Sequence, residues 1–213
     1  MTGPNTMTLL SRRTALVLLA AAAPLAASAP ARAAEVSPDQ ATDFIGRTGR
    51  DLMTAVNGAG STQDKAAALQ GIIDRAVDVN QIARFCLGRF WRQASPAQQQ
   101  DYIDLFHRVL VQNITGKVGD YQGVTLVVNR ATAREDGVAV TTTVTRPNNA
   151  PNRVDWLVSN ESGAPRIIDV IAEGTSLRLT QRNDYTAYLG RNNNDVQALI
   201  EALKKQANGQ PAG

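Results

Sequence analysis

The stretch RIIDVIAEGTSL, residues 166–177, places two carboxylates, Asp169 and Glu173, four residues apart. Such a pair raises the question of acid–base catalysis. If the apolar run is a strand, residues i and i+4 share a face but lie about 13 Å apart. That distance exceeds the roughly 6.5–9.5 Å of an inverting glycosidase pair. The spacing therefore favours a structural role, and we expect Glu173 to face the free N–H groups of a helix that Thr175 or Ser176 caps.

The chain contains one histidine, His107, and one cysteine, Cys86. A structural zinc site needs several Cys and His ligands, so we expect no metal. We expect His107 at the surface or at the edge of the core, because no nucleophile elbow lies near it in the sequence. A single cysteine cannot form an internal disulfide, and we expect a buried, unreactive thiol. The sequence also lacks a P-loop and a G-x-S-x-G motif, and we predict no catalytic residue and no cofactor.

The segment SRRTALVLLAAAAPLAASAPARA, residues 11–33, has the organisation of a bacterial export signal. Arg12 and Arg13 precede an Ala/Leu-rich run, and an A-x-A cleavage site ends at Ala33. We expect cleavage near Ala33, which leaves residues 34–213 as a single domain in the periplasm. The general secretory route and the twin-arginine route both fit this pattern.

Loss of the expected signal changes the charge of the chain. The full sequence has 22 Lys and Arg against 19 Asp and Glu, a net charge of +3. The signal contains Arg12, Arg13 and Arg32 and no acid, so 19 charges of each sign remain. A neutral domain argues against nucleic acid as a partner, because nucleic-acid binding needs a positive excess. No later apolar run approaches the ~20 residues of a membrane span.

Apolar side chains recur at intervals of three and four residues in the first half of the domain. This period predicts four helices, at about residues 38–57, 61–77, 78–88 and 95–121. The expected N-caps are Ser37, Ser61, Asp78 and Ser95. The fourth helix is the longest, about seven turns, because its apolar spacing continues toward Val118 and Tyr121.

After Gly123 the apolar period changes from helical to alternating. Four strands are expected, at residues 124–133, 137–145, 153–160 and 166–172, followed by helices at about 175–189 and 195–206. Short turns between the strands indicate an antiparallel meander. We therefore predict an α+β fold, in which helices pack on one side of a curved four-stranded antiparallel sheet. Composition alone does not distinguish a filled core from an apolar cavity between the two layers.

Two segments carry a family resemblance: CLGRFWRQASPAQQQDYIDLFHRVL (86–110) and DVIAEGTSLRLTQRNDYTAYL (169–189). Both resemble the MlaC family, also called the toluene-tolerance family, over roughly residues 41–204. The chain departs from the family pattern at Thr175, where a larger apolar residue is common, and at Cys86. The resemblance implies a periplasmic lipid carrier with a deep apolar cavity between helices and sheet, and no enzyme activity.

The resemblance also implies a ligand and partners. A phospholipid would be held by its acyl chains and shuttled between an outer-membrane lipoprotein–porin complex and an inner-membrane ABC transporter complex with a lipid-binding ring component. We expect the carrier to be a monomer. A carrier of another lipid class, such as hopanoids, and an enzyme on a similar cone-like α+β fold remain alternatives.

Candidate lipid-binding residues follow from apolar faces and positions within this implied fold. They are Leu110, Ile114, Val140, Val144, Trp156, Val158, Ile168, Val170 and Leu177. A second candidate feature is the arginine cluster of Arg84, Arg89 and Arg92 around Leu87-Gly88. At helical spacing Arg89 and Arg92 share a face, which could meet an acidic partner or a headgroup phosphate; a solvated face is the simpler alternative.

Overall fold

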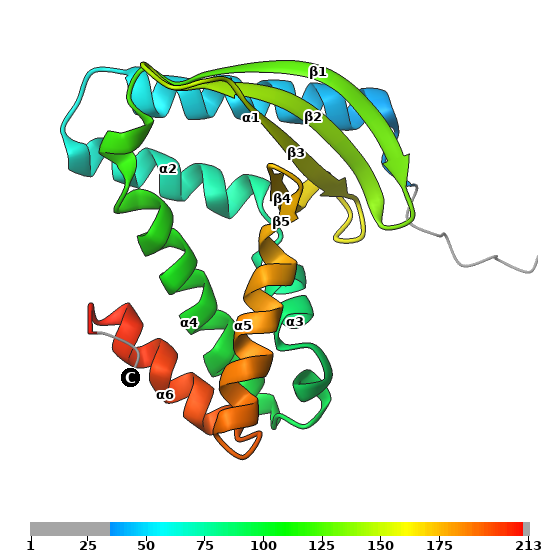
Figure 1. The fold of residues 1–213 in the computed structure, drawn as a ribbon, viewed down its shortest axis with the longest axis vertical. Helices are drawn as coiled ribbons and strands as arrows, with labels where there is room; N and C mark the ends of the chain where they lie inside the picture. Colours follow the sequence, from blue (N-terminus) through cyan, green and yellow to red (C-terminus); the bar gives the residue numbers. More distant parts are fainter. Residues whose placement is uncertain (1–34, 211–213) are drawn as a thin grey trace, which may run out of the picture. The chain divides into compact units, whose positions relative to one another are not determined.

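The structure is a computed structural model that describes residues 35–210, so the expected export signal at residues 1–33 lies outside the described residues. In chain order the helices are α1 (Pro38–Asn57), α2 (Thr62–Ala76), α3 (Val79–Leu87), η1 (Gly88–Arg92), α4 (Pro96–Thr115), η2 (Val118–Tyr121), α5 (Leu177–Arg191) and α6 (Val196–Ala207). The strands are β1 (Thr125–Arg134), β2 (Gly137–Thr145), β3 (Asn152–Ser159), β4 (Arg166–Ala172) and β5 (Thr175–Ser176). Figure 1 shows their arrangement.

The helix starts follow the capping residues in the sequence. Ser37, Ser61 and Ser95 each accept from the N3 backbone and form complete capping boxes, and Asp78 accepts from the backbone N–H of Gln81. These bonds satisfy N–H groups that have no partner inside the helix. The predicted starts are therefore confirmed.

The long fourth helix is shorter than its apolar spacing predicts. Helix α4 ends at Thr115, and a 3-10 turn, η2, holds Val118 and Tyr121. The break falls at Gly116-Lys117, because glycine lowers helix propensity. Val118 still packs on Val56 and Leu69, so the apolar side chain reaches the core from a separate element.

The sheet is an antiparallel meander in the order β1-β2-β3-β4-β5. A two-residue turn joins β1 to β2, and Figure 1 shows both strands bending along their length. The fold is α+β as expected. The difference from the predicted four strands is the short β5, which pairs with the end of β4 just before α5.

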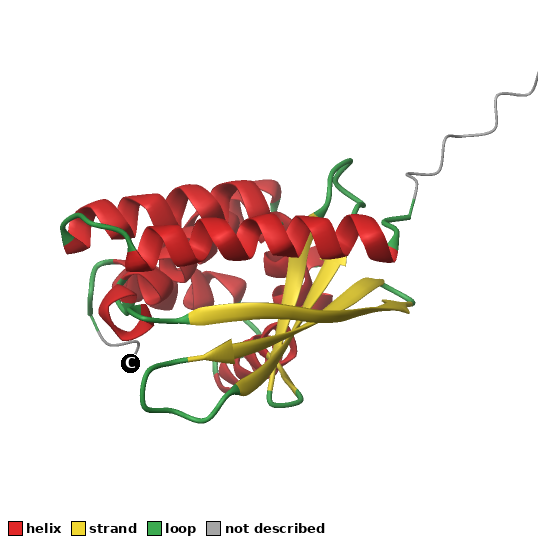
Figure 2. Ribbon diagram, turned by 90° about the horizontal axis from the view of Figure 1, so that it is seen from above, coloured by secondary structure: helices red, strands yellow, loops and turns green. Residues whose placement is uncertain are grey.

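The core has two main clusters. Helices α3, α4, α5 and α6 pack around Tyr102, Phe106 and Leu189 in a helical cluster. The second cluster lies between α1 and α2 on one side and the inner face of the sheet on the other. Figure 2 shows this helix layer running alongside the strands. None of the described helices is long and apolar enough to cross a membrane.

Candidate functional site

The cluster between α1, α2 and the sheet combines fully buried and partly buried apolar side chains, as the helical cluster also does. Its fully buried members are Val36, Ala41, Ile45, Ile72, Ala76, Val138, Val140, Val158 and Ile167. Around them pack apolar side chains that are only partly buried: Phe44, Leu52, Ala55, Val77, Val128, Ala131, Trp156 and Val170. We call these two sets together the inner apolar layer. Its partly buried members leave apolar surface that a ligand can cover.

Five of the predicted lipid-binding residues lie on this side of the sheet. Val140 and Val158 are buried in the inner apolar layer, and Trp156 and Val170 pack against it. Val140, Trp156 and Val170 are directly paired across three neighbouring strands. Val144 lies on the same face of β2 as Val140, because side chains alternate along a strand, and it is half-buried.

The other four predicted residues lie elsewhere. Leu110 packs against the helical cluster, and Ile114 is half-buried near the end of α4. Ile168 lies on the opposite face of the sheet with Ala139 and Leu157. Leu177 is the first residue of α5 and 51% exposed.

One polar group is built into the inner face of the sheet. Thr142 is fully buried, and its Oγ1 donates to the carbonyl oxygen of Val154 at 3.1 Å. The Oγ1 of Thr142 also accepts a hydrogen bond from Nε1 of Trp156 at 2.9 Å. The two bonds satisfy the hydroxyl and the indole and fix the orientation of the Trp156 ring on the inner face. The alternating Val/Thr pattern of residues 138–145 places Thr142 on the valine face, so its position could have been read from the sequence.

Helix α1 forms the other wall and lies very close to β1. A Cβ at Gly49 would lie 3.0 Å from Cδ2 of Leu126, so the absent side chain permits the approach. Phe44 and Leu52 lie on either side of this contact along α1 and remain half-buried. Both are apolar positions of the helix predicted at about residues 38–57, and neither was among the predicted lipid-binding residues.

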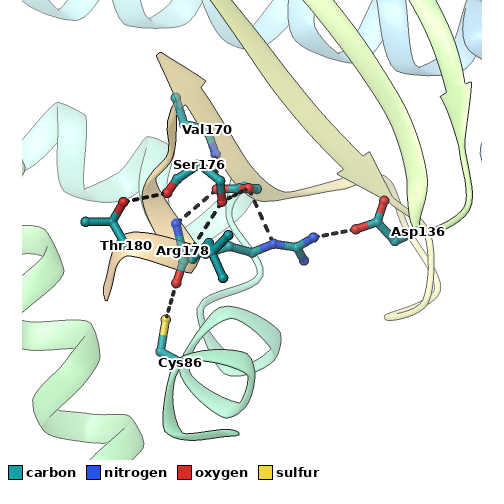
Figure 3. Close-up of polar contacts among 8 residues, drawn as sticks. Cys86, Asp136, Val170, Ser176, Arg178 and Thr180 are labelled. Atoms are coloured by element: carbon teal, nitrogen blue, oxygen red, sulfur yellow. Dashed lines mark hydrogen bonds and ion pairs between the residues drawn. The ribbon is translucent and has the colours of Figure 1, made fainter. Parts of the chain in front are cut away.

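Asp169 is the centre of a hydrogen-bond network rather than one half of a catalytic pair. Its carboxylate is 3% exposed and accepts from the Ser176 hydroxyl at 2.6 Å and from the backbone N–H groups of Val170 at 2.8 Å and Arg178 at 3.1 Å. Arg178 Nε lies 3.4 Å from the same carboxylate, and its Nη2 also pairs with Asp136 in the β1–β2 turn. Figure 3 shows the Arg178 side chain reaching Asp136. These contacts join the end of β4 to the start of α5.

The role predicted for Glu173 was wrong, and Asp169 fills it. The N-cap of α5 is Ser176, which accepts from the backbone N–H of Leu179. The carboxylate that bonds the first turn of the helix is Asp169, through the N–H of Arg178. Glu173 is exposed and has a left-handed φ of 52°, in the two-residue turn between β4 and β5. The strand β5 that follows this turn was not predicted, and it separates Glu173 from the start of α5 at Leu177.

Cys86 is buried as expected. Burial raises the pKa of its thiol to about 12, with a further contribution from the negative charge of Asp169. Its Sγ lies 3.4 Å from the carbonyl oxygen of Arg178, so it contacts the first turn of α5. Burial also raises the pKa of the Tyr102 and Tyr185 hydroxyls, which lie in the same helical cluster.

His107 is at the edge of the core, as predicted. Its Nε2 lies 2.7 Å from Oδ1 of Asp74, and both side chains are more than a third exposed. The pair lines an open groove of about 540 Å³ between α2, α3 and α4, whose other polar residues include Asp78, Asp104 and Arg166. Among residues 35–210 no group of three or more His, Cys, Asp or Glu side chains is arranged to hold a metal ion.

The fold and its layer define a class of protein: an α+β domain whose helices cover one face of an open, bent sheet, with partly accessible apolar side chains between them. The particular family follows from sequence. The chain belongs to the MlaC protein family, whose sequence model matches residues 47–205.

Two further comparisons agree with this family. The chain is 27% identical over 192 residues to the toluene tolerance protein Ttg2D of Pseudomonas putida. The aligned region covers 89% of this chain and 87% of that protein. It also resembles the solved structure of a phospholipid-binding protein from Ralstonia solanacearum in complex with a phospholipid. That match has a TM-score of 0.69 and 23% identity, and it covers 79% of this chain and 97% of the other. At this identity the structural match establishes the shared fold.

Proposed function

We propose that this protein is a periplasmic carrier that binds a phospholipid by its acyl chains in the inner apolar layer. The observation that carries the proposal is the partly buried apolar wall on both sides of that layer, Phe44 and Leu52 on α1 facing Trp156 and Val170 on the sheet. Membership in the MlaC family supports it, as does the phospholipid bound by the Ralstonia solanacearum protein of the same fold.

The physical task of such a carrier is to keep acyl chains out of water. Each exposed CH₂ costs about 0.8 kcal/mol, so a lipid with two long chains would face a cost on the order of 20 kcal/mol. A layer with apolar side chains on both walls removes that cost without reading the headgroup. The role of Asp169 in a structural network is consistent with a carrier that does no chemistry.

The route of the lipid extends the proposal. The carrier is exported with cleavage near Ala33 and works as a monomer. It receives phospholipid from, or delivers it to, an outer-membrane lipoprotein–porin complex and an inner-membrane ABC transporter complex with a lipid-binding ring component. This route rests on the family resemblance, and a hopanoid carrier is the alternative within the same class.

The lipid-binding surface is narrowed by the positions of the candidate residues. We assign acyl-chain contact to Val144, Trp156 and Val170, because they share the inner face and are partly accessible. Phe44 and Leu52 join them from α1. Val140 and Val158 lie on the same face of the sheet but are fully buried, and we assign them to the packing beneath these residues. Leu110, Ile114, Ile168 and Leu177 are not part of this surface in the present arrangement.

A matched pair of variants in the β1–β2 hairpin tests this assignment. Val144→Glu places a charge in the half-buried inner face, where the carboxylate loses hydration when a chain binds, so retained lipid should fall several-fold. Val127→Glu, on a side chain 60% exposed on the outer face of β1, should leave retained lipid unchanged. Lipid extracted per mole of folded protein is the measurement. Leu52→Glu, on the opposite wall, repeats the test should Val144→Glu not fold. Full retention of lipid in a folded Val144→Glu or Leu52→Glu protein would contradict the assignment.

A further inference from the structure

A polar seam runs between α2, which is part of the inner apolar layer, and α4, which is part of the helical cluster. Among the described residues, the helical cluster includes none of α2, and the clusters that contain α2 residues include none of α4. Two open grooves, of about 540 Å³ and about 460 Å³, flank the contact between the helices, and His107 and Asp104 line both. The exposed arginine cluster of Arg84, Arg89 and Arg92 lines neither groove. Since neither cluster spans the seam, polar side chains contribute to holding it closed.

One side-chain bond crosses this seam. His107 Nε2 lies 2.7 Å from Asp74 Oδ1, and the described residues contain no other side-chain hydrogen bond or ion pair between α2 and α4. Asp74 lies midway in sequence between Ile72 and Ala76, two buried members of the inner apolar layer. It faces the other side of α2, because two residues of an α-helix turn by about 200°. The pair therefore joins the back of one wall of the inner apolar layer to the helical cluster.

The larger groove reaches the edge of the inner apolar layer. Val77 lines this groove, packs against that layer and lies in the short connection between α2 and α3. Val79 and Ile103 line the same groove and pack against the helical cluster. Opening of the seam would therefore uncover apolar side chains of both clusters, next to the layer that we assign to lipid.

The charge of the pair changes with pH at His107. Histidine is the side chain that ordinarily changes charge between pH 5 and pH 8, and His107 is the only histidine of the chain. Protonation turns the bond to Asp74 into a charge-assisted one, which is the stronger kind. An imidazolium at this place faces three acids and two arginines that line the two grooves: Asp74, Asp78, Asp104, Arg108 and Arg166.

We propose that His107 and Asp74 form a pH-dependent latch, which holds the seam closed when the imidazole is protonated and slows the loss of lipid from the inner apolar layer. The latch rests on the lipid-carrier function proposed above and adds a control to it. Both side chains are more than a third exposed, so solvent screening keeps the effect small. The latch therefore changes the rate of lipid exchange a few-fold and leaves the fold of the domain as it is.

The test measures the loss of a fluorescent phospholipid from the loaded protein to phosphatidylcholine vesicles at pH 5.5 and at pH 7.5. The unmodified protein should lose lipid about threefold more slowly at pH 5.5, in line with the small effect of an exposed ion pair. His107→Gln keeps a side chain that forms hydrogen bonds but does not titrate, so its rates should be equal at the two pH values. Asp74→Asn should also lose most of the pH response. Asp104→Asn is the matched control, because Asp104 lines both grooves but bonds to Gln100, and it should keep the ratio.

Three results would overturn the latch. They are the absence of a pH response in the unmodified protein, an undiminished response in His107→Gln, and an equal loss of response in Asp74→Asn and Asp104→Asn. The last result would assign the response to the net charge of the grooves and not to the pair.

Hydrogen exchange of the α2 amides in lipid-free protein gives a second readout, which does not depend on the carrier function. At pH 5.5 exchange should be about threefold slower in the unmodified protein than in His107→Gln, and at pH 7.5 the two proteins should agree. A protein that takes up no lipid and still shows this difference would contradict the carrier function and support the pH-dependent closure of the seam. A protein that takes up lipid but shows no such difference would overturn the latch alone.

Discussion

Asp169 ties three separate segments together. It accepts from Ser176 and Arg178 at the start of α5, while Arg178 extends the network to Asp136 in the β1–β2 turn. The acid was a catalytic candidate in the sequence only because its partners, Ser176 and Arg178, are 7 and 9 positions away and reveal themselves through folding. Arg178 is the second residue of α5 and has no acid near it within that helix. This was the one sign in the sequence that Arg178 pairs with a carboxylate elsewhere in the chain.

The network predicts unequal effects for two neutral isosteres. Asp169→Asn replaces an acceptor by an amide and leaves the buried Arg178 with one acid, so the free energy of unfolding should fall by about 2 kcal/mol. Glu173→Gln changes an exposed side chain and should stay within about 0.5 kcal/mol. Urea unfolding of both variants measures the difference, and the folded proteins should retain lipid. A larger loss in Glu173→Gln would contradict the account of this turn.

The buried thiol and phenols predict a loss of stability at alkaline pH. Burial raises the pKa of Cys86 from 9.0 to about 12, and raises those of Tyr102 and Tyr185 as well. A raised pKa in the folded state means that the unfolded chain loses its protons first. The stabilisation is complete below about pH 9 and declines as pH rises toward 12.

Urea titrations at pH 8 and pH 10.5 test this sign, and the free energy of unfolding should be lower at the higher pH. Cys86→Ala should show a shallower decline, because one titrating group has gone. In the native protein at pH 8.5 the thiol should resist iodoacetamide, since the thiolate is the nucleophile. Rapid alkylation of the folded protein at that pH would show that the thiol is not buried as described.

At the scale of elements, starts were easier to predict than ends and faces. Serine caps fixed the beginnings of α1, α2 and α4 because the capping bonds are local. The register shift in the β3–β4 pair, between Leu157 and Val158, turns Ile168 to the opposite face from Val170. A strict alternation puts Ile168 and Val170 together, and nothing local in the sequence marks the bulge. Ile168 therefore lies on the other face of the sheet from Val140, Trp156 and Val170.

The junction of α3 and η1 depends on a backbone that only glycine adopts easily. Gly88 has a φ of 58° and a ψ of −128°, and an added Cβ would lie 3.1 Å from Nε of Arg182. Gly88→Ala should therefore lower the free energy of unfolding by about 1–2 kcal/mol. Gly190→Ala, in α5 with nothing within 4 Å of the added Cβ, should raise it by up to about 0.5 kcal/mol. Thermal unfolding of both proteins provides the comparison. Equal stability of the two variants would remove the strain argument at Gly88.

At the scale of the molecule, the division of the core into two clusters is the feature that matters most. The helical cluster centres on Tyr102 and Leu189, both essentially inaccessible to solvent, and partly buried apolar side chains also pack against it. The inner apolar layer keeps partly exposed side chains on both walls. The sequence predicted helices over one face of a sheet, but it did not separate these two clusters. Apolar spacing shows which side of a helix is buried, but it does not show which element packs against that side. Leu110 was assigned to the lipid surface on that ground and instead packs with the helical cluster.

The central claim is that the inner apolar layer holds a phospholipid. The most direct measurement is native mass spectrometry of the protein purified without denaturant, followed by extraction and identification of the bound lipid. We predict a mass increase equal to one phospholipid per chain, which is lost on unfolding. A protein that is reproducibly free of lipid, and that takes up none when incubated with phospholipid vesicles, would contradict the claim.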